Sequence, residues 1–280
     1  MLLLAMLSFD LQGHRGARGL RPENTLSGFQ HALDLGVTTL ELDVGMTADG
    51  VLVVAHDTHL SGAIARLDGR WLEQPVAIHS LTFEQLQAYD VGHLNPDDPY
   101  SERFPDQVPV EGSRVPTLAQ VLAISDTVLF NVETKLDPTA PDDSASPQEF
   151  AQALLDTIPD SMRPRVTIQS FDWRTLRLLQ EDFRTACLTK PGNAGRKSPW
   201  TAELEPSDYR GLVPLVHAAG CDIWSPYYRQ ASAGRVEQAH RLGLKVIPWT
   251  VNDAKLAAEL IERGVDGLIT DYPDRIKGPG

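Results

Sequence analysis

The apolar positions of the chain follow two periods in alternation. Short apolar runs, typical of buried strands, are followed by segments in which apolar residues recur every three or four positions, as in helices packed on one face. The first such unit is a strand at 9–14 and a helix that ends at about Leu35, before Gly36. Asn24 or Thr25 is the expected N-cap of that helix. The pattern predicts a β–α unit at the start of the chain.

Further strands follow, and helices separate most of them. Counted with the first, the strands begin near residues 9, 38, 127, 165, 185, 221, 245 and 267. The later helices are predicted over 117–125, 147–158, 172–182, 208–219, 232–242 and 253–263. Strand–helix units in this number indicate a parallel (β/α)8 barrel, the TIM barrel, for which about 250 residues are typical. An open doubly wound sheet is the alternative, but no GxGxxG or GxxxxGKS/T sequence follows the first strand to support it.

A hairpin and an insertion extend the predicted barrel. The strand at 38–44 passes through a turn at Asp49-Gly50 into a strand at 51–56, and this spacing predicts a hairpin. The next residues lack clean periodicity and are rich in Pro, Asp and Gly. We expect them to form a small insertion after the second strand region that caps one side of the site. The predicted organisation is a single α/β domain over residues 1–280, with the insertion at about 60–114.

The charge of the chain narrows the range of partners. Its 25 Lys and Arg against 38 Asp and Glu give a net charge of −13. An acidic surface disfavours nonspecific binding to nucleic acid or to anionic membranes. It is compatible with a small anionic substrate, because a local cation can reverse the field within one cleft. We therefore expect a small-molecule substrate and no nucleic-acid partner, and the oligomeric state stays open.

The N-terminus and the two cysteines each leave an alternative. The apolar segment at 1–12 is too short for stable membrane insertion and lacks both a basic start and an A-x-A cleavage site. It is either a shortened signal peptide, which implies a periplasmic or secreted protein, or the lead-in to the first strand of a cytoplasmic one.

Cys187 and Cys221 lie in apolar, strand-like runs, where we expect buried core thiols. A disulfide between neighbouring strands is the alternative for the two cysteines.

Charged side chains gather at the predicted C-terminal ends of the strands, where TIM barrels carry their active sites. The second strand ends in Glu41-Leu42-Asp43, and the two-residue period of a strand directs Glu41 and Asp43 to the same side. Two carboxylates on one face repel each other unless a cation lies between them. The pair therefore predicts a divalent metal site, and two solvated acids at a strand end are the alternative.

The third barrel strand adds a carboxylate and an amine to this set. In the run from Asn131 to Lys135, Glu133 and Lys135 face the same way. Three carboxylates without a nearby cysteine favour one hard divalent cation, Mg²⁺ or Ca²⁺, over zinc. We expect Lys135 to contact a phosphate oxygen, and an ion pair with a strand-end acid is its alternative role.

Two histidines follow strands that converge on the acids. His14 ends the first strand, and His56 ends the hairpin. One histidine on each side of a scissile bond suits in-line proton transfer, in which one accepts a proton and the other protonates the leaving oxygen. Either histidine can take either role. Phe171, Trp224 and Trp249 lie at later strand ends, as core residues or as walls of a substrate site.

Several short motifs stand in order along nearly the whole chain. They are His-Arg-Gly at 14–16, Pro-Glu-Asn-Thr at 22–25, Glu-Leu-Asp at 41–43, Asp-Gly-Val at 49–51, His-Asp at 56–57, Pro-Thr-Leu at 116–118, Glu-Thr-Lys at 133–135, Gln-Ser-Phe at 169–171, Trp-Thr-Val-Asn at 249–252 and Gly-Val-Asp-Gly-Leu-Ile-Thr-Asp-Tyr-Pro at 264–273. In order and spacing these motifs resemble the glycerophosphodiester phosphodiesterase family. The insertion and the loops near 137–147 and 190–207 lie outside the resemblance.

The resemblance implies a TIM barrel with an insertion, and hydrolysis of a glycerophosphodiester to sn-glycerol 3-phosphate and an alcohol with a divalent cation. Direct attack by water and closure of a cyclic phosphate by the glycerol 2-hydroxyl are both compatible with it. Transferred by position, the family's roles fall to His14 and His56 as general acid and base, to Glu41, Asp43 and Glu133 as metal ligands, to Arg15 and Lys135 as phosphate contacts, and to Phe171, Trp224 and Trp249 beside the glycerol.

Two other functions fit the same scaffold. A phospholipase D-like phosphodiesterase acting on lysophospholipid or sphingomyelin would need an apolar entrance for an acyl chain, whereas the insertion is mostly polar, as in NPDDPYSERFPDQ. A binding protein without activity would be expected to lack a histidine or a metal-site acid, and this chain has all of them. Hydrolysis of a glycerophosphodiester is therefore the favoured function.

Overall fold

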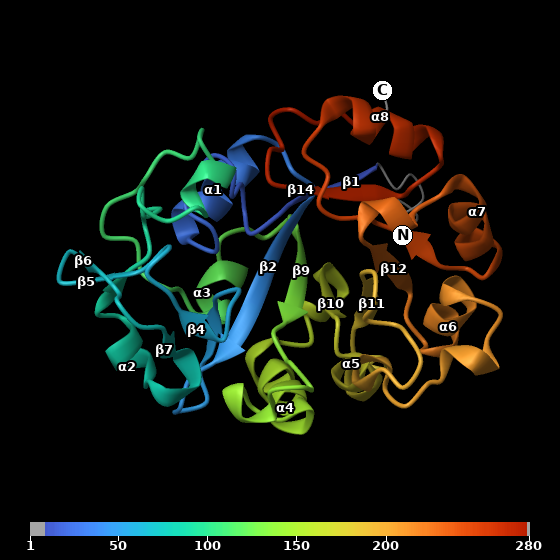
Figure 1. Ribbon diagram of the computed structural model, residues 1–280, viewed down its shortest axis with the longest axis horizontal. Coiled ribbons are helices and arrows are strands. Elements are labelled where there is room, and N and C mark those ends of the chain that lie inside the picture. Colours follow the sequence, from blue (N-terminus) through green and yellow to red (C-terminus); the bar gives the residue numbers. More distant parts are fainter. Residues whose placement is uncertain (1–8, 279–280) are drawn as a thin grey trace.

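The barrel predicted from the alternating pattern is present. The computed structural model describes residues 9–278, so the predictions for the apolar N-terminal segment fall largely outside the described residues. Eight parallel strands form a nearly closed barrel (Figure 1). In order around the barrel they are β13 (Lys245–Val246), β12 (Ile223–Pro226), β11 (Arg184–Thr189), β10 (Val166–Ser170), β9 (Leu129–Thr134), β2 (Thr39–Met46), β1 (Asp10–Gly13) and β14 (Gly267–Thr270).

Backbone hydrogen bonds join the two ends of this strand order. The amide of Asp266 donates to the carbonyl oxygen of Val246 at 2.9 Å, and the amide of Ile269 donates to that of Pro248 at 3.0 Å. The amide of Val251 donates to Ile269 at 2.9 Å. β13 is shorter than the strand predicted at 245–250, because Pro248 has no N–H with which to extend the ladder. These bonds exclude the open doubly wound sheet.

Helices cover the outside of the barrel (Figure 1). α1 (Leu26–Asp34) follows β1, and the Thr25 side chain caps it by accepting a hydrogen bond from the Gly28 amide at 3.1 Å. The other helices around the barrel are α3 (Leu118–Leu122), α4 (Pro147–Thr157), α5 (Trp173–Leu179), α6 (Leu212–Ala218), α7 (Ala233–Arg241) and α8 (Ala254–Glu262). Each lies within its predicted range, because the predicted ranges also took in the non-helical capping residues.

The apolar and acidic residues of β2 face opposite sides, as the strand period predicts. Leu40, Leu42 and Val44 belong to the main hydrophobic core, together with buried residues of the surrounding helices. Glu41 and Asp43 alternate with them and are just as fully buried. The alternation therefore places two carboxylates on the inner side of the barrel, where only polar partners can stabilise them.

A layer of buried amides holds one of these carboxylates from within the barrel. The Asn131 side-chain amide donates to Gln12 Oε1 at 2.7 Å and to Gln169 Oε1 at 3.0 Å. Gln169 Nε2 donates in turn to Glu41 Oε1 at 2.7 Å. Three strands thus contribute one amide each to a connected network, which fixes the position of the Glu41 carboxyl group.

The insertion has more order than its sequence indicates. β3 (Leu52–Val54) pairs antiparallel with β2 and confirms the predicted hairpin. Beyond it lie two small sheets and one helical turn: β4 (His59–Leu60) with β7 (Val76–Ala77), β5 (Arg66–Leu67) with β6 (Arg70–Trp71) and β8 (Tyr89–Asp90), and α2 (Phe83–Leu86). Strands of two residues are too short to give a period in the sequence. Leu60, Ile78 and Leu86 belong to a small core that these elements share.

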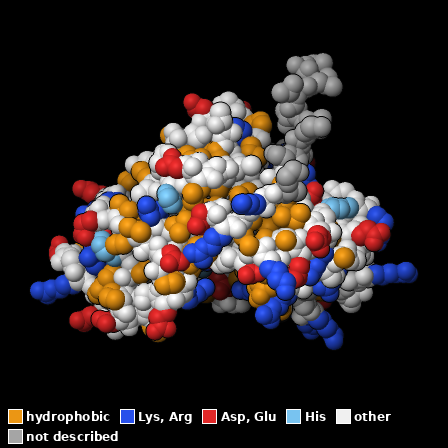
Figure 2. All heavy atoms as spheres, turned by 90° about the horizontal axis from the view of Figure 1, so that it is seen from above, with side chains coloured by type: hydrophobic (Ala, Val, Ile, Leu, Met, Phe, Trp, Pro, Cys, Tyr) orange, Lys and Arg blue, Asp and Glu red, His pale blue; other side chains and the backbone are white. Residues whose placement is uncertain are grey.

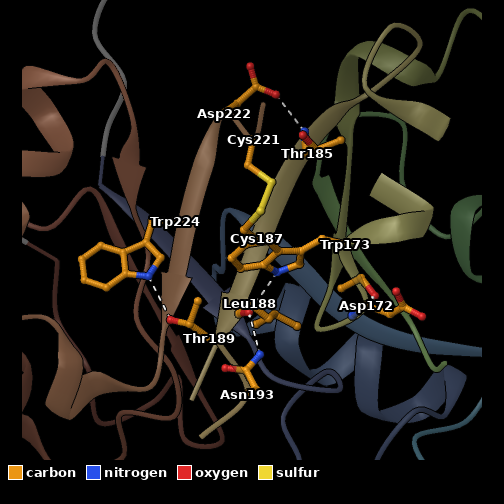
Figure 3. The surroundings of a disulfide bond; sticks show 11 residues. Asp172, Trp173, Thr185, Cys187, Leu188, Thr189, Asn193, Cys221, Asp222 and Trp224 are labelled. Carbon is orange, nitrogen blue, oxygen red and sulfur yellow. Dashed lines mark hydrogen bonds between the residues drawn. A yellow bond between two sulfur atoms is a disulfide. The ribbon is translucent and has the colours of Figure 1, made fainter. Parts of the chain in front are cut away.

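Cys187 and Cys221 form a disulfide (Figure 3). The expectation of two free core thiols is therefore wrong, and the alternative of a bridge between neighbouring strands is correct. Cys187 lies on β11 and Cys221 just before β12, which pairs with β11. Both residues are buried and their Cα atoms are 5.9 Å apart, within the range that a disulfide spans. Strand pairing brings the two thiols together, and residue counts alone do not reveal that pairing.

Reducing this disulfide is expected to lower the free energy of unfolding by about 2–4 kcal/mol, because the bridge restricts the unfolded chain over a sequence separation of 34 residues. Urea unfolding of oxidised and reduced protein would measure the difference. In the control, the double variant Cys187→Ala, Cys221→Ala should show the lower stability with or without reductant. Equal midpoints for oxidised and reduced wild-type protein would contradict the expectation.

The described surface mixes charges of both signs. Figure 2 shows acidic and basic side chains interspersed over the face that it displays. The large exposed apolar side chains, Leu26, Leu67, Val108 and Leu178, come from separate segments. Between residues 9 and 278, no helix has the length and apolar character that crossing a bilayer requires. Isolated apolar residues of this kind are ordinary on a protein surface.

Candidate active site

A cavity of about 360 Å³ opens at the mouth of the barrel and is called the inner cavity below. Eight of the ten predicted site residues line it: His14, Arg15, Glu41, His56, Glu133, Lys135, Phe171 and Trp249. Asp43 is fully buried against Glu41 and Glu133, and Trp224 lies elsewhere. The strand ends that the sequence places together therefore do meet in one cavity.

A tight turn after β1 delivers two of these residues. The amide of Gly16 donates a hydrogen bond to the carbonyl oxygen of Gly13 at 3.2 Å. Gly16 has a φ of 87°, and a Cβ atom there would lie 2.7 Å from the backbone of Gly28 in α1. Only glycine fits both the backbone conformation and the close approach. His14 and Arg15, between the two glycines, are therefore fixed in place by the packing of the turn against α1.

Three carboxylates form a buried cluster beside the cavity. Ligand oxygens of Glu41, Asp43 and Glu133 all lie within 4.8 Å of one another. Burial, followed by the negative charges of Asp43 and Glu133, raises the pKa of Glu41 well above its ordinary value. Asp43 Oδ1 is buried without a hydrogen-bond partner among the described residues. An all-oxygen donor set in which a buried oxygen accepts no hydrogen bond fits a hard divalent cation.

Arg15 provides positive charge close to the cluster. Its Nη1 donates to Glu23 Oε1 at 2.7 Å, and its Nε lies 3.1 Å from Asp43 Oδ2. Asn24 Nδ2 donates to the same Asp43 oxygen at 2.9 Å. Although burial favours the neutral acid, the charge of Arg15, followed by those of His56 and Lys135, holds the pKa of Asp43 well below its usual range. Asp43 is therefore ionised, as a metal ligand has to be.

Lys135 forms the ion pair that its alternative role described. Its Nζ donates to Glu133 Oε1 at 2.7 Å and lies 3.5 Å from Asp43 Oδ1. Burial disfavours the ammonium ion, yet Glu133 and Asp43 raise the pKa of Lys135 above its ordinary value. Because Lys135 also lines the cavity, its charge is available to an anion bound there.

His14 is anchored through one ring nitrogen. Its Nδ1 lies 2.6 Å from Asp271 Oδ1, and its Nε2 lies 4.0 Å from Glu41 Oε2. Arg18 and Asn252 also bind the Asp271 carboxylate, with Arg18 Nε 2.9 Å from Oδ1 and Asn252 Nδ2 2.7 Å from Oδ2. Arg18 Nη2 lies 3.2 Å from His14 Nδ1. Burial, followed by the charge of Arg18, lowers the pKa of His14 to about 4 against the opposing effect of Asp271. The ring is therefore neutral at pH 7. Because the pKa of Asp271 is lowered and an ionised carboxylate can only accept, we assign the ring proton to Nδ1, which donates to Asp271.

His56 has an equivalent anchor at the rim. It follows β3, and its Nδ1 lies 2.6 Å from Asp57 Oδ1. Its side chain is 32% exposed, compared with 11% for His14. Both imidazoles line the same cavity, and each has a carboxylate partner at Nδ1. The structure thus brings together a buried and a partly exposed histidine whose Nε2 atoms remain for other partners.

Several residues that build this cavity were not among the predicted site residues. Asp271 belongs to the motif at 264–273. Its position directly after β14 could have identified it as a site residue. Glu23 and Arg18 lie in the loop before α1, next to predicted site residues. Tyr100 and Arg103 come from the insertion, and the Tyr100 hydroxyl donates to Glu23 Oε2. Nothing in the aperiodic insertion marked these two, but their position agrees with the expectation that it caps the site.

Trp224 is a correction to the predicted site. Along β12, Ile223 packs in the barrel interior and Trp224, one residue later, packs in the outer core. Its ring is fully buried, and its Nε1 donates to Thr189 Oγ1 at 2.9 Å (Figure 3). Because successive strand residues point to opposite faces, this side chain cannot reach the cavity. Phe171 and Trp249 do line it, with ring centroids 5.5 Å apart.

The barrel and the chemistry at its mouth define the class of TIM-barrel enzymes, which carry the active site at the C-terminal ends of the strands. Within that class the chain belongs to the glycerophosphoryl diester phosphodiesterase family, whose model matches residues 14–275. The resemblance found in the sequence motifs is thereby confirmed.

Individual relatives agree with this assignment. The chain is 30% identical to the candidate glycerophosphodiester phosphodiesterase YhdW of Bacillus subtilis, over 94% of each chain. A crystal structure of a candidate glycerophosphoryl diester phosphodiesterase from Silicibacter pomeroyi matches with a TM-score of 0.87 at 36% identity, over 96% of this chain and 91% of that one. A phosphodiesterase from Oleispira antarctica, in complex with the product sn-glycerol-3-phosphate, shares the fold with a TM-score of 0.68 at 20% identity, over 96% and 95% of the two chains.

Proposed function

We propose that this enzyme hydrolyses glycerophosphodiesters to sn-glycerol 3-phosphate and an alcohol, with one divalent cation and with His14 and His56 as the proton-transfer pair. Family membership supports the activity, as does the product in the Oleispira antarctica complex. The observation that carries the mechanism is the geometry of the inner cavity. There, two carboxylate-anchored histidines face a cluster of three buried carboxylates.

Glu41, Asp43 and Glu133 would hold the cation, Mg²⁺ or Ca²⁺. When bound, such an ion neutralises phosphate charge and stabilises the charge that develops in the transition state. Arg15 and Lys135 assist as phosphate contacts, because both are cationic and line the cavity next to the acids. Preorganised charges of this kind act strongly in a site largely shielded from water.

The surroundings of the two histidines favour a division of roles. His14, with Nδ1–H held by Asp271, offers the Nε2 lone pair and serves as the acceptor of a proton from the attacking oxygen. His56 lies at the rim, beside Asp57, and also lines a second cavity that continues outward. It therefore serves as the donor that protonates the departing alcohol oxygen. Both roles belong to one in-line displacement at phosphorus.

Release of sn-glycerol 3-phosphate is the measurement that tests the reaction. With Mg²⁺ or Ca²⁺ present, a coupled assay is expected to detect this product from glycerophosphodiesters with different alcohols. Lysophosphatidylcholine, with its hydrolysis followed by the release of choline, is the comparison substrate for the phospholipase D-like alternative, and we expect it to be hydrolysed much more slowly. Release of free glycerol with a phosphorylated alcohol, or faster turnover of the lysophospholipid, would contradict the proposed function.

A further inference from the structure

A second cavity, of about 350 Å³, adjoins the inner one and is called the outer cavity below. The two share His56, Asp57, Glu133, Lys135, Phe171 and Trp249. The shared residues include a proton-transfer histidine, a metal-site acid and a phosphate contact of the proposed function, on which this inference rests. A phosphodiester whose phosphorus lies at these residues would extend one ester group into each cavity.

The outer cavity is completed by loops that the family motifs do not cover. Asp137 and Asp143 come from the loop after β9, and Lys190 and Trp200 come from the loop after β11. These stretches are the ones at 137–147 and 190–207 that lay outside the sequence resemblance. Their side chains have no part in the proposed proton transfers, metal site or phosphate contacts, so the proposed reaction does not fix their identity.

Three aromatic rings enclose part of the outer cavity. The ring of Trp200 lies 6.5 Å from that of Phe171 at an interplanar angle of 82°, and Trp249 lies 5.5 Å from Phe171 at 85°. Lys190 Nζ is 4.9 Å from the centroid of the Phe171 ring. Faces of aromatic rings attract cations, and quaternary ammonium groups are bound by aromatic cages in this way. The lysine shows that the face of Phe171 is accessible to a cation.

The lining residues that the two cavities do not share differ in charge. Those of the inner cavity include Arg15, Arg18 and Arg103, with Glu41 as the acid beside them. The outer cavity has Asp137 and Asp143 instead, with Lys190 as the only cation among its unshared lining residues, and Asp57 is at the boundary. Within the described residues, no hydrogen bond or ion pair involves the carboxylate of Asp143. The unshared lining of the outer cavity therefore favours a cationic group.

We propose that the outer cavity binds the leaving alcohol and selects alcohols that carry a cationic ammonium group, with Trp200 and Asp143 as specificity-determining residues. The glycerol then lies in the inner cavity, which arginine and tyrosine side chains line. In this arrangement the ammonium displaces Lys190 from the face of Phe171. The phosphate keeps its place between the two histidines.

A matched pair of substrates tests this directly: the glycerophosphodiester of choline, and that of 3,3-dimethylbutanol, which has the same shape without the charge. Wild-type kcat/KM is expected to favour the choline ester about tenfold. Trp200→Ala should lower that ratio about fivefold to tenfold, because it removes one ring of the cage. Asp143→Asn should lower it about twofold to fivefold. Lys190→Met removes a competing cation and should raise the ratio.

Two control variants distinguish the effects of the Asp143 charge and of the Trp200 ring from a general loss of structure. Asp142→Asn removes the same charge from the next residue, which is exposed and does not line the cavity, and it should leave the ratio unchanged. Trp200→Phe should restore most of the preference lost in Trp200→Ala. A wild-type ratio near one, or a ratio that neither Trp200→Ala nor Asp143→Asn changes, would overturn the inference. So would a lower ratio in Lys190→Met.

A failure of the proposed function has a different signature. If wild-type protein hydrolysed neither ester, the reaction itself would be wrong. Equilibrium binding would then decide the inference on its own, with free choline and free 3,3-dimethylbutanol titrated by calorimetry. Tighter binding of choline, weakened in Trp200→Ala and Asp143→Asn, supports a cation-selective cavity, and equal binding of the two alcohols contradicts it.

Discussion

Replacing His14 with alanine is expected to lower kcat for glycerophosphodiester hydrolysis by about 10²- to 10⁴-fold, the usual contribution of a positioned general acid or base. In the proposed mechanism the Nε2 atom of His14 accepts the proton, and the variant removes the ring that Asp271 holds through Nδ1. His56→Ala should cause a loss of the same order, because the departing oxygen would lose its proton donor. Initial rates of sn-glycerol 3-phosphate release would measure both variants.

Affinity for the cation should be nearly unchanged in both histidine variants, since the carboxylate cluster remains intact. His59→Ala is the matched control, because His59 lies on β4, three residues after His56, and does not line the inner cavity. This variant is expected to keep the wild-type rate. Wild-type turnover in either His14→Ala or His56→Ala would show that the pair does not carry the proton transfers.

Whether a side chain could be placed on the correct face from the sequence depended on the length of its strand. β2 has eight residues, so its period was readable and placed Glu41 and Asp43 on the inner face correctly. β12 has only four residues, and the side of Trp224 was not resolved by its neighbours. The prediction for Trp224 rested on its position near a strand end. The structure shows that the alternation of side chains between the two faces of a strand decides which residues reach the cavity.

Contacts between distant segments were the part that the sequence could not supply. The partner of His14, Asp271, lies 257 residues away in the chain. Likewise, Tyr100 reaches Glu23 from the insertion, and the bridge between Cys187 and Cys221 depends on which strands are neighbours. Local periodicity carries no information about such pairs. They follow only once barrel closure has fixed which strand ends stand side by side.

The two basic residues beside the carboxylate cluster balance its charge only in part. Arg15 also forms an ion pair with Glu23, which lies outside the cluster. The closest ion-pair partner of Lys135 is Glu133. Asp43 Oδ1 accepts no hydrogen bond and lies 3.5 Å from Lys135 Nζ, and the pKa of Glu41 is raised, by burial first and then by Asp43 and Glu133. The basic residues therefore balance the cluster only in part, and a divalent ion would complete it.

Removal of divalent cations with a chelator is accordingly expected to lower activity by at least about 10²-fold, because a metal of this kind provides several kcal/mol of transition-state stabilisation. Addition of Mg²⁺ or Ca²⁺ should restore the rate. The same ions should also raise the thermal unfolding temperature, since a ligand that binds only the folded state stabilises it. Glu133→Gln should weaken both effects by removing one ligand.

A second acidic group, Asp90, His93 and Glu111, supplies the control for adventitious binding. There the Arg66 guanidinium already lies between the three residues, with Nη2 2.8 Å from His93 Nδ1 and 2.9 Å from Glu111 Oε1. Glu111→Gln should therefore leave the cation response unchanged, and calorimetry should find a single site. Full activity in the presence of chelator would contradict the metal site. If Glu111→Gln abolished the effect of the cation on activity and unfolding temperature, the cation would instead bind in the insertion.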